Sequence, residues 1–273
     1  MKYNPKRLAS VGAFLLAGAL AHGTIIFADD FEARSSGDLD GQGTWTSPSG
    51  LNQYTVETDG GLGNVIIGGG NQRIFTESGS GDGSSPTFAT FAAESHNQIF
   101  VRFNYNATAT SGGPFFSFRL TDDDGDFNST LGITVQNGQL RPRSTNASGG
   151  ITQLTSGVPA ISADTTHTIV FMAEKTGAAG DNFDRVTAWL NPALAGENAD
   201  DLLAVANLSG GVVATADTGV SSFSAISFQK GSSGGQAAIQ LDSMMVAIPE
   251  PSVYAALLSL GALAIIVLLR RHR

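Results

Sequence analysis

The chain has 273 residues, of which 15 are Lys or Arg and 24 are Asp or Glu, so its formal net charge is −9. This acidic balance excludes the basic footprint of a nucleic-acid-binding protein. The sequence has no Cys, which excludes disulfides, thiolate metal ligands and Cys nucleophiles. The length suits one domain, and we expect a large all-β one.

The N-terminus predicts an export signal. Three basic residues precede an uncharged, mostly apolar run over residues 8–21. This order and length are typical of a secretory signal peptide, and two small-x-small cleavage sites end at Ala21 and Gly23. The alternative is a short membrane anchor, but a 14-residue helix is only ~21 Å long. We therefore predict a signal peptide over residues 1–21.

From residue 24 to residue 248 the sequence shows the period-two alternation of β-strands. Short runs rich in Phe, Val, Ile and Thr are separated by Gly, Asn, Asp and Ser. Each strand offers one apolar face to a core, so about a dozen antiparallel strands predict a sandwich or barrel. The clearest runs are 99–105, 116–120, 131–135, 169–173, 186–190, 223–228 and 239–244.

Two local signals refine this pattern. Asn137-Gly138 stands between two strand-like runs, and Asn-Gly is the preferred two-residue hairpin turn because both positions need a positive φ. Residues 192–205 form the one stretch that is compatible with a helix. We predict a hairpin at the first and at most a turn of helix in the second.

An acidic loop follows the run that ends at residue 120. Asp122, Asp124, Asp126 and Asn128 alternate as calcium ligands do, and a Gly lies among them. The loop lacks the Gly at position six and the Glu at position twelve of an EF-hand. A calcium site and a solvated hairpin turn both remain open, since Asp and Gly also favour turns.

The C-terminus predicts a membrane span. Residues 252–269 are 18 uncharged residues, which as a helix would extend ~27 Å and just cross the apolar core of a bilayer. The tail after them contains Arg270, Arg271 and Arg273, and basic residues next to a span stay in the cytoplasm. We therefore expect the preceding domain to lie outside.

Immediately before this span stands Pro249-Glu250-Pro251. The motif, the apolar helix and the Arg-rich end resemble, in this order, the PEP-CTERM sorting signal of Gram-negative bacteria over residues 249–273. The resemblance implies export through the secretion machinery and recognition by exosortase, a membrane processing enzyme. Cleavage near the motif would then release the protein or attach it at the cell surface.

Three stretches of the middle segment resemble exported laminin-G-like domains: residues 29–32, 184–192 and 239–243. The resemblance implies a concanavalin A-like jelly roll, in which two antiparallel sheets pack face to face. Some members of that family bind carbohydrate or protein and others cleave glycans, so the fold alone leaves function open.

A search for catalytic residues finds no motif. A retaining glycosidase needs two carboxylates about 5–5.5 Å apart, which on one strand means alternate positions, and that pattern is absent. His96 and His167 share no motif with each other or with a nucleophile. Trp45 and Trp189 are candidates for stacking on sugars, although a sandwich core also needs large apolar residues.

These signals predict a signal peptide over 1–21, an antiparallel β-sandwich over 24–248 and a sorting signal over 249–273. We expect an exported cell-surface or extracellular matrix protein that serves adhesion and binds polysaccharide. A polysaccharide-acting enzyme on the same fold is the alternative.

Overall fold

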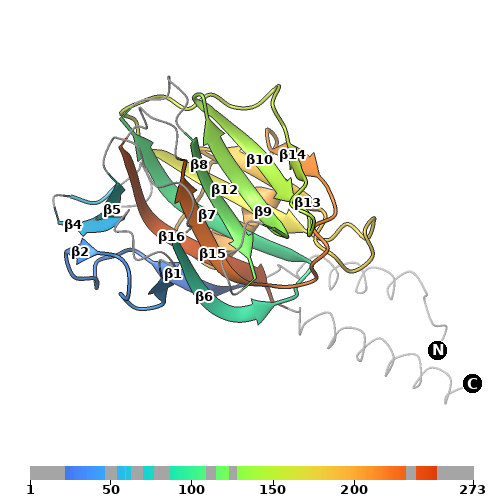
Figure 1. Cartoon of the computed structure of the whole chain (residues 1–273), viewed down its shortest axis with the longest axis horizontal. Coiled ribbons are helices and arrows are strands. Elements are labelled where there is room, and N and C mark those ends of the chain that lie inside the picture. The colour runs from blue at the N-terminus through green and yellow to red at the C-terminus, as the bar shows by residue number, and fades with distance from the viewer. Residues whose placement is uncertain are drawn as a thin grey trace, which may run out of the picture.

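The computed structural model of this chain describes residues 22–46, 54–58, 60–62, 70–76, 87–108, 115–122, 128–231 and 238–250. Within these residues the chain forms two antiparallel sheets, one of nine strands and one of seven, that pack face to face (Figure 1). The predicted all-β, sandwich-like architecture is therefore confirmed.

The nine-stranded sheet has the order β14-β13-β12-β7-β16-β5-β4-β2, and β1 also pairs with β16. Its strands are β1 (Gly23–Asp29), β2 (Gly37–Asp38), β4 (Thr55–Glu57), β5 (Arg73–Thr76), β7 (Gln98–Ala107), β12 (His167–Glu174), β13 (Arg185–Leu190), β14 (Val212–Thr215) and β16 (Ile239–Pro249).

The seven-stranded sheet has the order β11-β10-β9-β8-β15-β6-β3. Its strands are β3 (Trp45–Thr46), β6 (Thr87–Glu94), β8 (Phe115–Thr121), β9 (Thr130–Gln136), β10 (Gln139–Thr145), β11 (Ile151–Gln153) and β15 (Phe223–Lys230).

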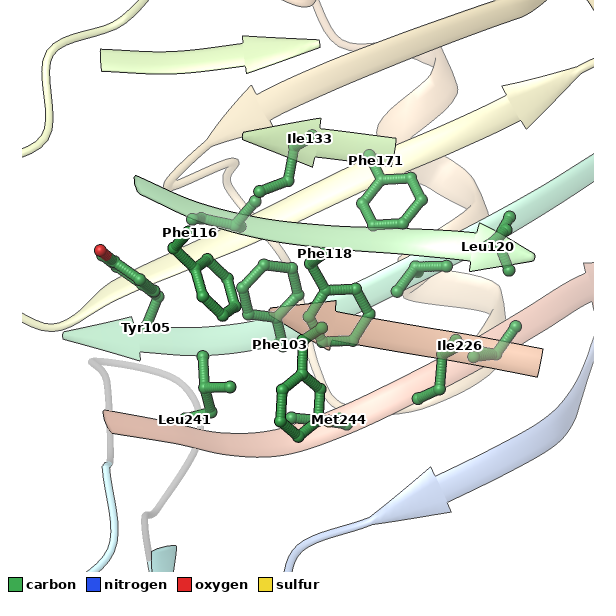
Figure 2. Close-up of a cluster of buried hydrophobic side chains, with 14 of the residues drawn as sticks. Phe103, Tyr105, Phe116, Phe118, Leu120, Ile133, Phe171, Ile226, Leu241 and Met244 are labelled. Atoms are coloured by element: carbon green, nitrogen blue, oxygen red, sulfur yellow. The ribbon is translucent and has the colours of Figure 1, made fainter. Parts of the chain in front are cut away.

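The core lies between the two sheets and is rich in aromatic rings (Figure 2). The rings of Phe103 on β7 and Phe118 on β8 stack across the interface, with centroids 4.2 Å apart and planes 8° apart. Phe116 and Leu120 point to the same side as Phe118, as the period-two alternation predicts. The residues between them, Ser117 and Arg119, therefore face away from the core.

The hairpin at Asn137-Gly138 is also confirmed. Both residues have positive φ, 52° and 67°, as a type I′ turn requires. Gln136 pairs directly with Gln139, so the turn fixes the register of β9 against β10.

A short helix, α2 (Ala199–Ala204), continues into the 3₁₀ turn η1 (Val205–Asn207), and it is shorter than the helix-compatible stretch 192–205. Asn198 caps α2 by accepting a hydrogen bond from the amide of Asp201. Apolar residues of α2 pack on the outer face of the nine-stranded sheet and form a second buried cluster there. One outer face of the sandwich is thus partly covered by an apolar contact.

In the part of the chain that the structure describes, no helix is long and apolar enough to cross a membrane. The predicted signal peptide, 1–21, and the predicted span, 252–269, lie outside these residues.

Candidate functional site

The outer face of the seven-stranded sheet carries polar residues where the inner face carries aromatic ones. One cross-strand row runs over the whole sheet, because each of its members pairs with the next. From β3 to β11 the row reads Thr46, Phe88, Ser227, Arg119, Gly132, Arg143 and Gln153.

A second row lies beside it on the same face and is also polar: Gln229, Ser117, Thr134 and Arg141. The two rows are joined by hydrogen bonds. Gln153 donates through Nε2 to Thr134 Oγ1 at 2.8 Å, and Arg119 donates through Nη2 to Gln229 Oε1 at 3.3 Å. We call these two rows together the polar face.

The middle of the polar face is buried although it lies outside the sandwich core. Ser117 and Ser227 are 0% exposed and Arg119 is 1% exposed. Three buried polar atoms of this face have no hydrogen-bond partner among the described residues: Ser117 Oγ, Ser227 Oγ and Arg143 Nε. Since buried polar groups are nearly always paired with protein or water, the face has hydrogen-bonding capacity that its own described side chains leave unused.

Toward β10 the face becomes accessible and cationic. Arg141 and Arg143 are both partly exposed. The guanidinium of Arg143 lies over the ring of Phe115, 5.9 Å from its centroid, and burial lowers the pKa of Arg143. Arg141 donates to Gln139 Oε1 at 2.6 Å and to Gln136 Oε1 at 3.1 Å. These neutral amides orient the Arg141 guanidinium and leave its charge in place.

Gly132 separates Arg119 from Arg143 in the first row. A Cβ at this position would lie 2.1 Å from the carbonyl oxygen of Phe118, which no side chain tolerates. Glycine is therefore required by the close approach of β9 to β8. As a consequence, the row has no side chain between its two arginines.

The seven strands of this sheet contain one carboxylate, Glu94, at the end of β6. Its Oε2 lies 2.9 Å from His96 Nδ1. Within the described residues the polar face therefore has no pair of carboxylates such as a glycosidase uses. His167 is on the other sheet, where its Nε2 accepts a hydrogen bond from the amide of Ser162 at 3.2 Å.

The predicted calcium loop is described only at its two ends. Asp122 follows β8 and accepts a hydrogen bond from Thr121 Oγ1 at 3.2 Å, and Asn128 precedes β9. Asp124 and Asp126 lie outside the described residues. Where the structure describes the chain, it holds no group of three acidic, His or Cys residues that would suit a metal ion. Calcium binding at this loop stays a prediction.

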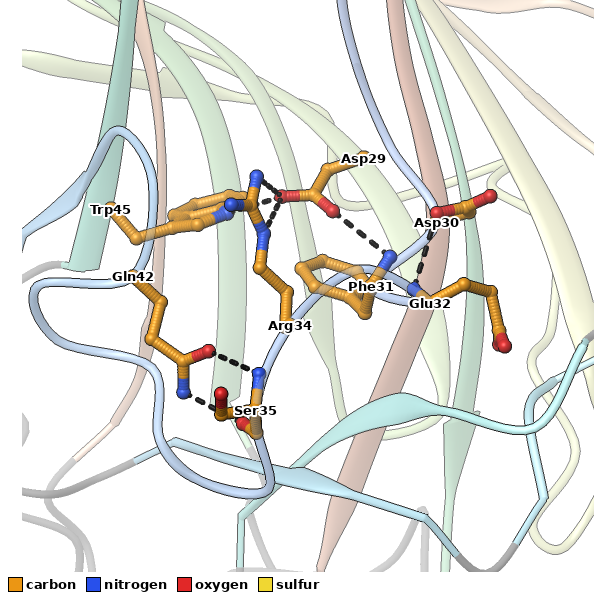
Figure 3. A network of polar contacts seen from close by, with 8 residues as sticks. All are labelled: Asp29, Asp30, Phe31, Glu32, Arg34, Ser35, Gln42 and Trp45. Atoms are coloured by element: carbon orange, nitrogen blue, oxygen red, sulfur yellow. Dashed lines mark hydrogen bonds and ion pairs between the residues drawn. The ribbon is translucent and has the colours of Figure 1, made fainter.

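Trp45 lies in the core. Of the two roles that the sequence left open for it, core packing and stacking on a sugar, the structure shows core packing. It is 1% exposed, and its indole Nε1 donates to Asp29 Oδ2 at 2.7 Å (Figure 3). Arg34 donates hydrogen bonds to the same oxygen through Nε and Nη2, at 3.0 and 2.7 Å. In this position the Trp45 ring packs against Phe27 and has no face for a sugar.

Trp189 lies on the outer face of the nine-stranded sheet, in the cluster under α2, and is 4% exposed. Its Nε1 donates to the carbonyl of Leu208 at 3.4 Å. The ring also borders a hollow of about 360 Å³, which Asn191 and Ser209 line with it. Contact between this edge and a sugar stays a prediction.

The predicted sorting motif begins at the end of β16. Pro249 pairs with Gly23 at the start of β1. The amide of Glu250 donates to the carbonyl of His22 at 2.7 Å, and Thr24 Oγ1 donates to Glu250 Oε1 at 2.5 Å. Pro251 and the three tail arginines, Arg270, Arg271 and Arg273, lie outside the described residues. The two ends of the described chain therefore meet in one hydrogen-bonded corner.

The sequence analysis missed Arg141 and Arg143. Both alternate with residues that face the core, so strand periodicity already placed them on the outer side. The Asn137-Gly138 turn also placed Gly132 opposite Arg143. The sequence did not show what packs on the outer face of each sheet. It therefore could not show which outer face α2 covers and which one stays polar.

No protein-family model and no curated protein matches this chain. Among solved structures it is similar to the botulinum neurotoxin serotype G binding domain, with TM-score 0.46 and 9% identity over 88% of this chain and 51% of that one. It is also similar to the cellulose-induced protein Cip1, with TM-score 0.44 and 12% identity over 81% of this chain and 96% of that one.

A third similar structure is a sialidase, with TM-score 0.43 and 11% identity over 84% of this chain and 18% of that one. This chain spans about half of the neurotoxin domain and a smaller part of the sialidase. These likenesses are distant. The fold and the site define this chain as an all-β sandwich with one polar outer face.

Proposed function

We propose that this protein binds polysaccharide through the polar face of its seven-stranded sheet. The observation that carries the proposal is the partly exposed end of the polar face, where Arg141, Arg143 and Gln153 lie side by side on β10 and β11. Sugar hydroxyls both donate and accept hydrogen bonds, and these side chains supply the complementary groups.

Binding is favoured over cleavage. A glycosidase needs two suitably spaced carboxylates, and the strands that form this face contain only Glu94, at the end of β6. The described part of the face also has no His or Tyr that would serve as the base of a lyase. A polysaccharide-acting enzyme is therefore the second candidate.

The cellular setting of this binding function is also a proposal. The order of a signal peptide, a sandwich and a Pro-Glu-Pro motif before an apolar run supports an exported protein that exosortase processes for the cell surface or matrix. The resemblance of residues 29–32, 184–192 and 239–243 to laminin-G-like domains supports, as a further part of this proposal, a concanavalin A-like jelly roll.

The test uses the full chain, purified in detergent, on a glycan array. We expect binding to at least one polysaccharide. Replacing Gln153 and Gln139, the neighbour of Arg141 on the same side of β10, together by Ala should weaken it about thirtyfold, because each of the two lost hydrogen bonds contributes about 1 kcal/mol. The matched control replaces Gln98 and Gln240 on the nine-stranded sheet by Ala and should leave binding unchanged. Absence of glycan binding, or equal losses in both double variants, would refute the proposal.

A further inference from the structure

We propose that the polysaccharide is acidic, and that its uronate carboxylates pair with Arg141 and Arg143 on β10. This inference rests on the proposed function and names the class of glycan that the polar face takes. It is argued from the distribution of charge over the fold, from the surroundings of the two guanidinium groups and from their placement on the sheet.

The charge of this face is opposite to that of the molecule. The whole chain carries a net charge of −9, and only nine of its 15 basic residues lie between residues 22 and 250. Three of these nine, Arg119, Arg141 and Arg143, share the polar face, while the strands of this sheet contain one carboxylate at the edge of β6. Arg141 and Arg143 are partly exposed, so an excess of positive charge reaches the surface on this face of an acidic protein.

Of the four arginines elsewhere in the described chain, three pair with carboxylates of the protein itself, and the fourth, Arg102, is buried on the nine-stranded sheet. These ion pairs are Arg34–Asp29, Arg73–Glu57 and Arg185–Glu174. On β10 the hydrogen bonds of Arg141 go to two neutral amides, and Arg143 has an aromatic ring beneath it and no described carboxylate within ion-pair distance. The charges of these two residues remain to be compensated by something outside the described chain.

Arg143 has the stronger requirement. Its Nε is buried and has no hydrogen-bond partner, although removing a charged donor from water is costly unless it is paired. A carboxylate fits the partly exposed guanidinium of Arg143 best, because its two oxygens match the planar fork of a guanidinium and accept two parallel hydrogen bonds. The ring of Phe115 holds the guanidinium from below and leaves its edge for this contact.

The spacing suits several acidic groups on one chain. Arg141 and Arg143 are two positions apart on one strand, so their stems lie ~7 Å apart. Thr134 and Gln153 supply neutral hydrogen-bonding groups next to the two arginines. A uronate polymer presents carboxylates and hydroxyls together, as this mixture requires. The acidic remainder of the protein interferes little, because salt screens charges beyond about 8 Å at physiological ionic strength.

The experiment compares three polymers on the full chain in detergent: polygalacturonate, the same polymer with its carboxyls methyl-esterified, and dextran sulfate. We expect polygalacturonate to bind at least tenfold more tightly than the ester. Arg143→Gln should weaken polygalacturonate binding at least tenfold and leave binding of the ester unchanged. Arg143→Lys should recover only part of the affinity, since it keeps the charge and loses the fork.

Arg185→Gln is the matched control, because it removes the same charge from the nine-stranded sheet and should not change binding. Arg141→Gln provides a second test if Arg143→Gln fails to fold. Equal affinity for the acid and the ester, with the Gln139 and Gln153 double variant still impaired, would overturn the inference and leave the proposed function standing. Tighter, Arg143-dependent binding of dextran sulfate would overturn the carboxylate class, and absence of binding to every polysaccharide would remove the proposed function as well.

Discussion

Asp242 shows how far one residue can depart from its behaviour in water. It is 1% exposed, in β16, and its two oxygens accept hydrogen bonds from the amides of Leu62 and Ser243 at 2.7 and 2.6 Å. Burial raises the pKa of Asp242 to about 7, and the negative charge of Glu32 adds to this rise. The two hydrogen bonds act in the opposite direction and offset the burial only in part.

This pKa predicts a stability that falls as the pH rises. An acid whose pKa is higher in the folded state binds its proton more tightly there, so its stabilising contribution is full below the unfolded pKa of 3.8 and is lost as the pH approaches 7. The loss is at most ~4 kcal/mol at 1.36 kcal/mol per pKa unit. Urea unfolding of wild type at pH 5 and pH 8 should show this fall, and Asp242→Asn should reduce it.

The variant should also be less stable than wild type at pH 5, because an Asn presents a donor where one of the two amides needs an acceptor. Asp181→Asn, at a side chain that is 86% exposed, is the control and should keep the wild-type dependence. An Asp242→Asn protein with the same pH dependence as wild type would show that the carboxylate is already ionised at pH 5.

At the scale of elements, β1 and β16 join the beginning and the end of the described chain. The pairing runs from Gly23 with Pro249 to Asp29 with Met244, and Thr24 and His22 hold Glu250. The first two residues of the predicted sorting motif therefore belong to the folded edge of the nine-stranded sheet. In our proposal, exosortase recognises these residues and must therefore reach this edge of the sheet.

Replacing Pro249-Glu250-Pro251 by three alanines should leave the protein held by its C-terminal segment in the inner membrane. The reason is the place of the motif directly before the predicted span. Immunoblots of membrane and extracellular fractions for an epitope in the sandwich measure the outcome. Thr24→Val is the control, because it removes the hydroxyl that binds Glu250 and leaves the motif intact. Undiminished release of the mature form by the triple variant would count against recognition of the motif.

The strands also show which pairings can be predicted from the sequence. The Asn137-Gly138 turn gave the register of β9 and β10, since a two-residue hairpin leaves no freedom in pairing. The pairing of β8 with β15 could not be predicted, because about a hundred residues of chain separate the two strands. Periodicity likewise placed Trp189 in a strand, but it could not show that Trp189 lies under α2 or that Trp45 contacts Asp29. Local patterns fix strands and turns, and long-range pairing decides which side chains share a face.

At the scale of the whole molecule, one aromatic core holds the two sheets together. The ring of Phe118 on β8 contacts Phe103 and Phe171 from the opposite sheet (Figure 2). It also contacts Phe228 from its own sheet. The chain has no cysteine, so cross-links add nothing to this packing. The position of the polar face depends on this core, because the residues that alternate with its rings form that face.

Phe118→Ala should therefore lower the free energy of unfolding by about 3–5 kcal/mol, which is the usual cost of deleting a buried Phe. That is a large share of the roughly 5–15 kcal/mol that stabilises a typical domain. Phe88→Ala is the matched control, because this Phe is partly exposed on the outer face of the same sheet, and its removal should cost much less.

Urea unfolding followed by far-ultraviolet circular dichroism and by tryptophan fluorescence should show one coincident transition, since Trp45 and Trp189 report on the core and on the α2 cluster. Two separated transitions, or a loss below ~1 kcal/mol for Phe118→Ala, would mean that the sheets do not share the core described here.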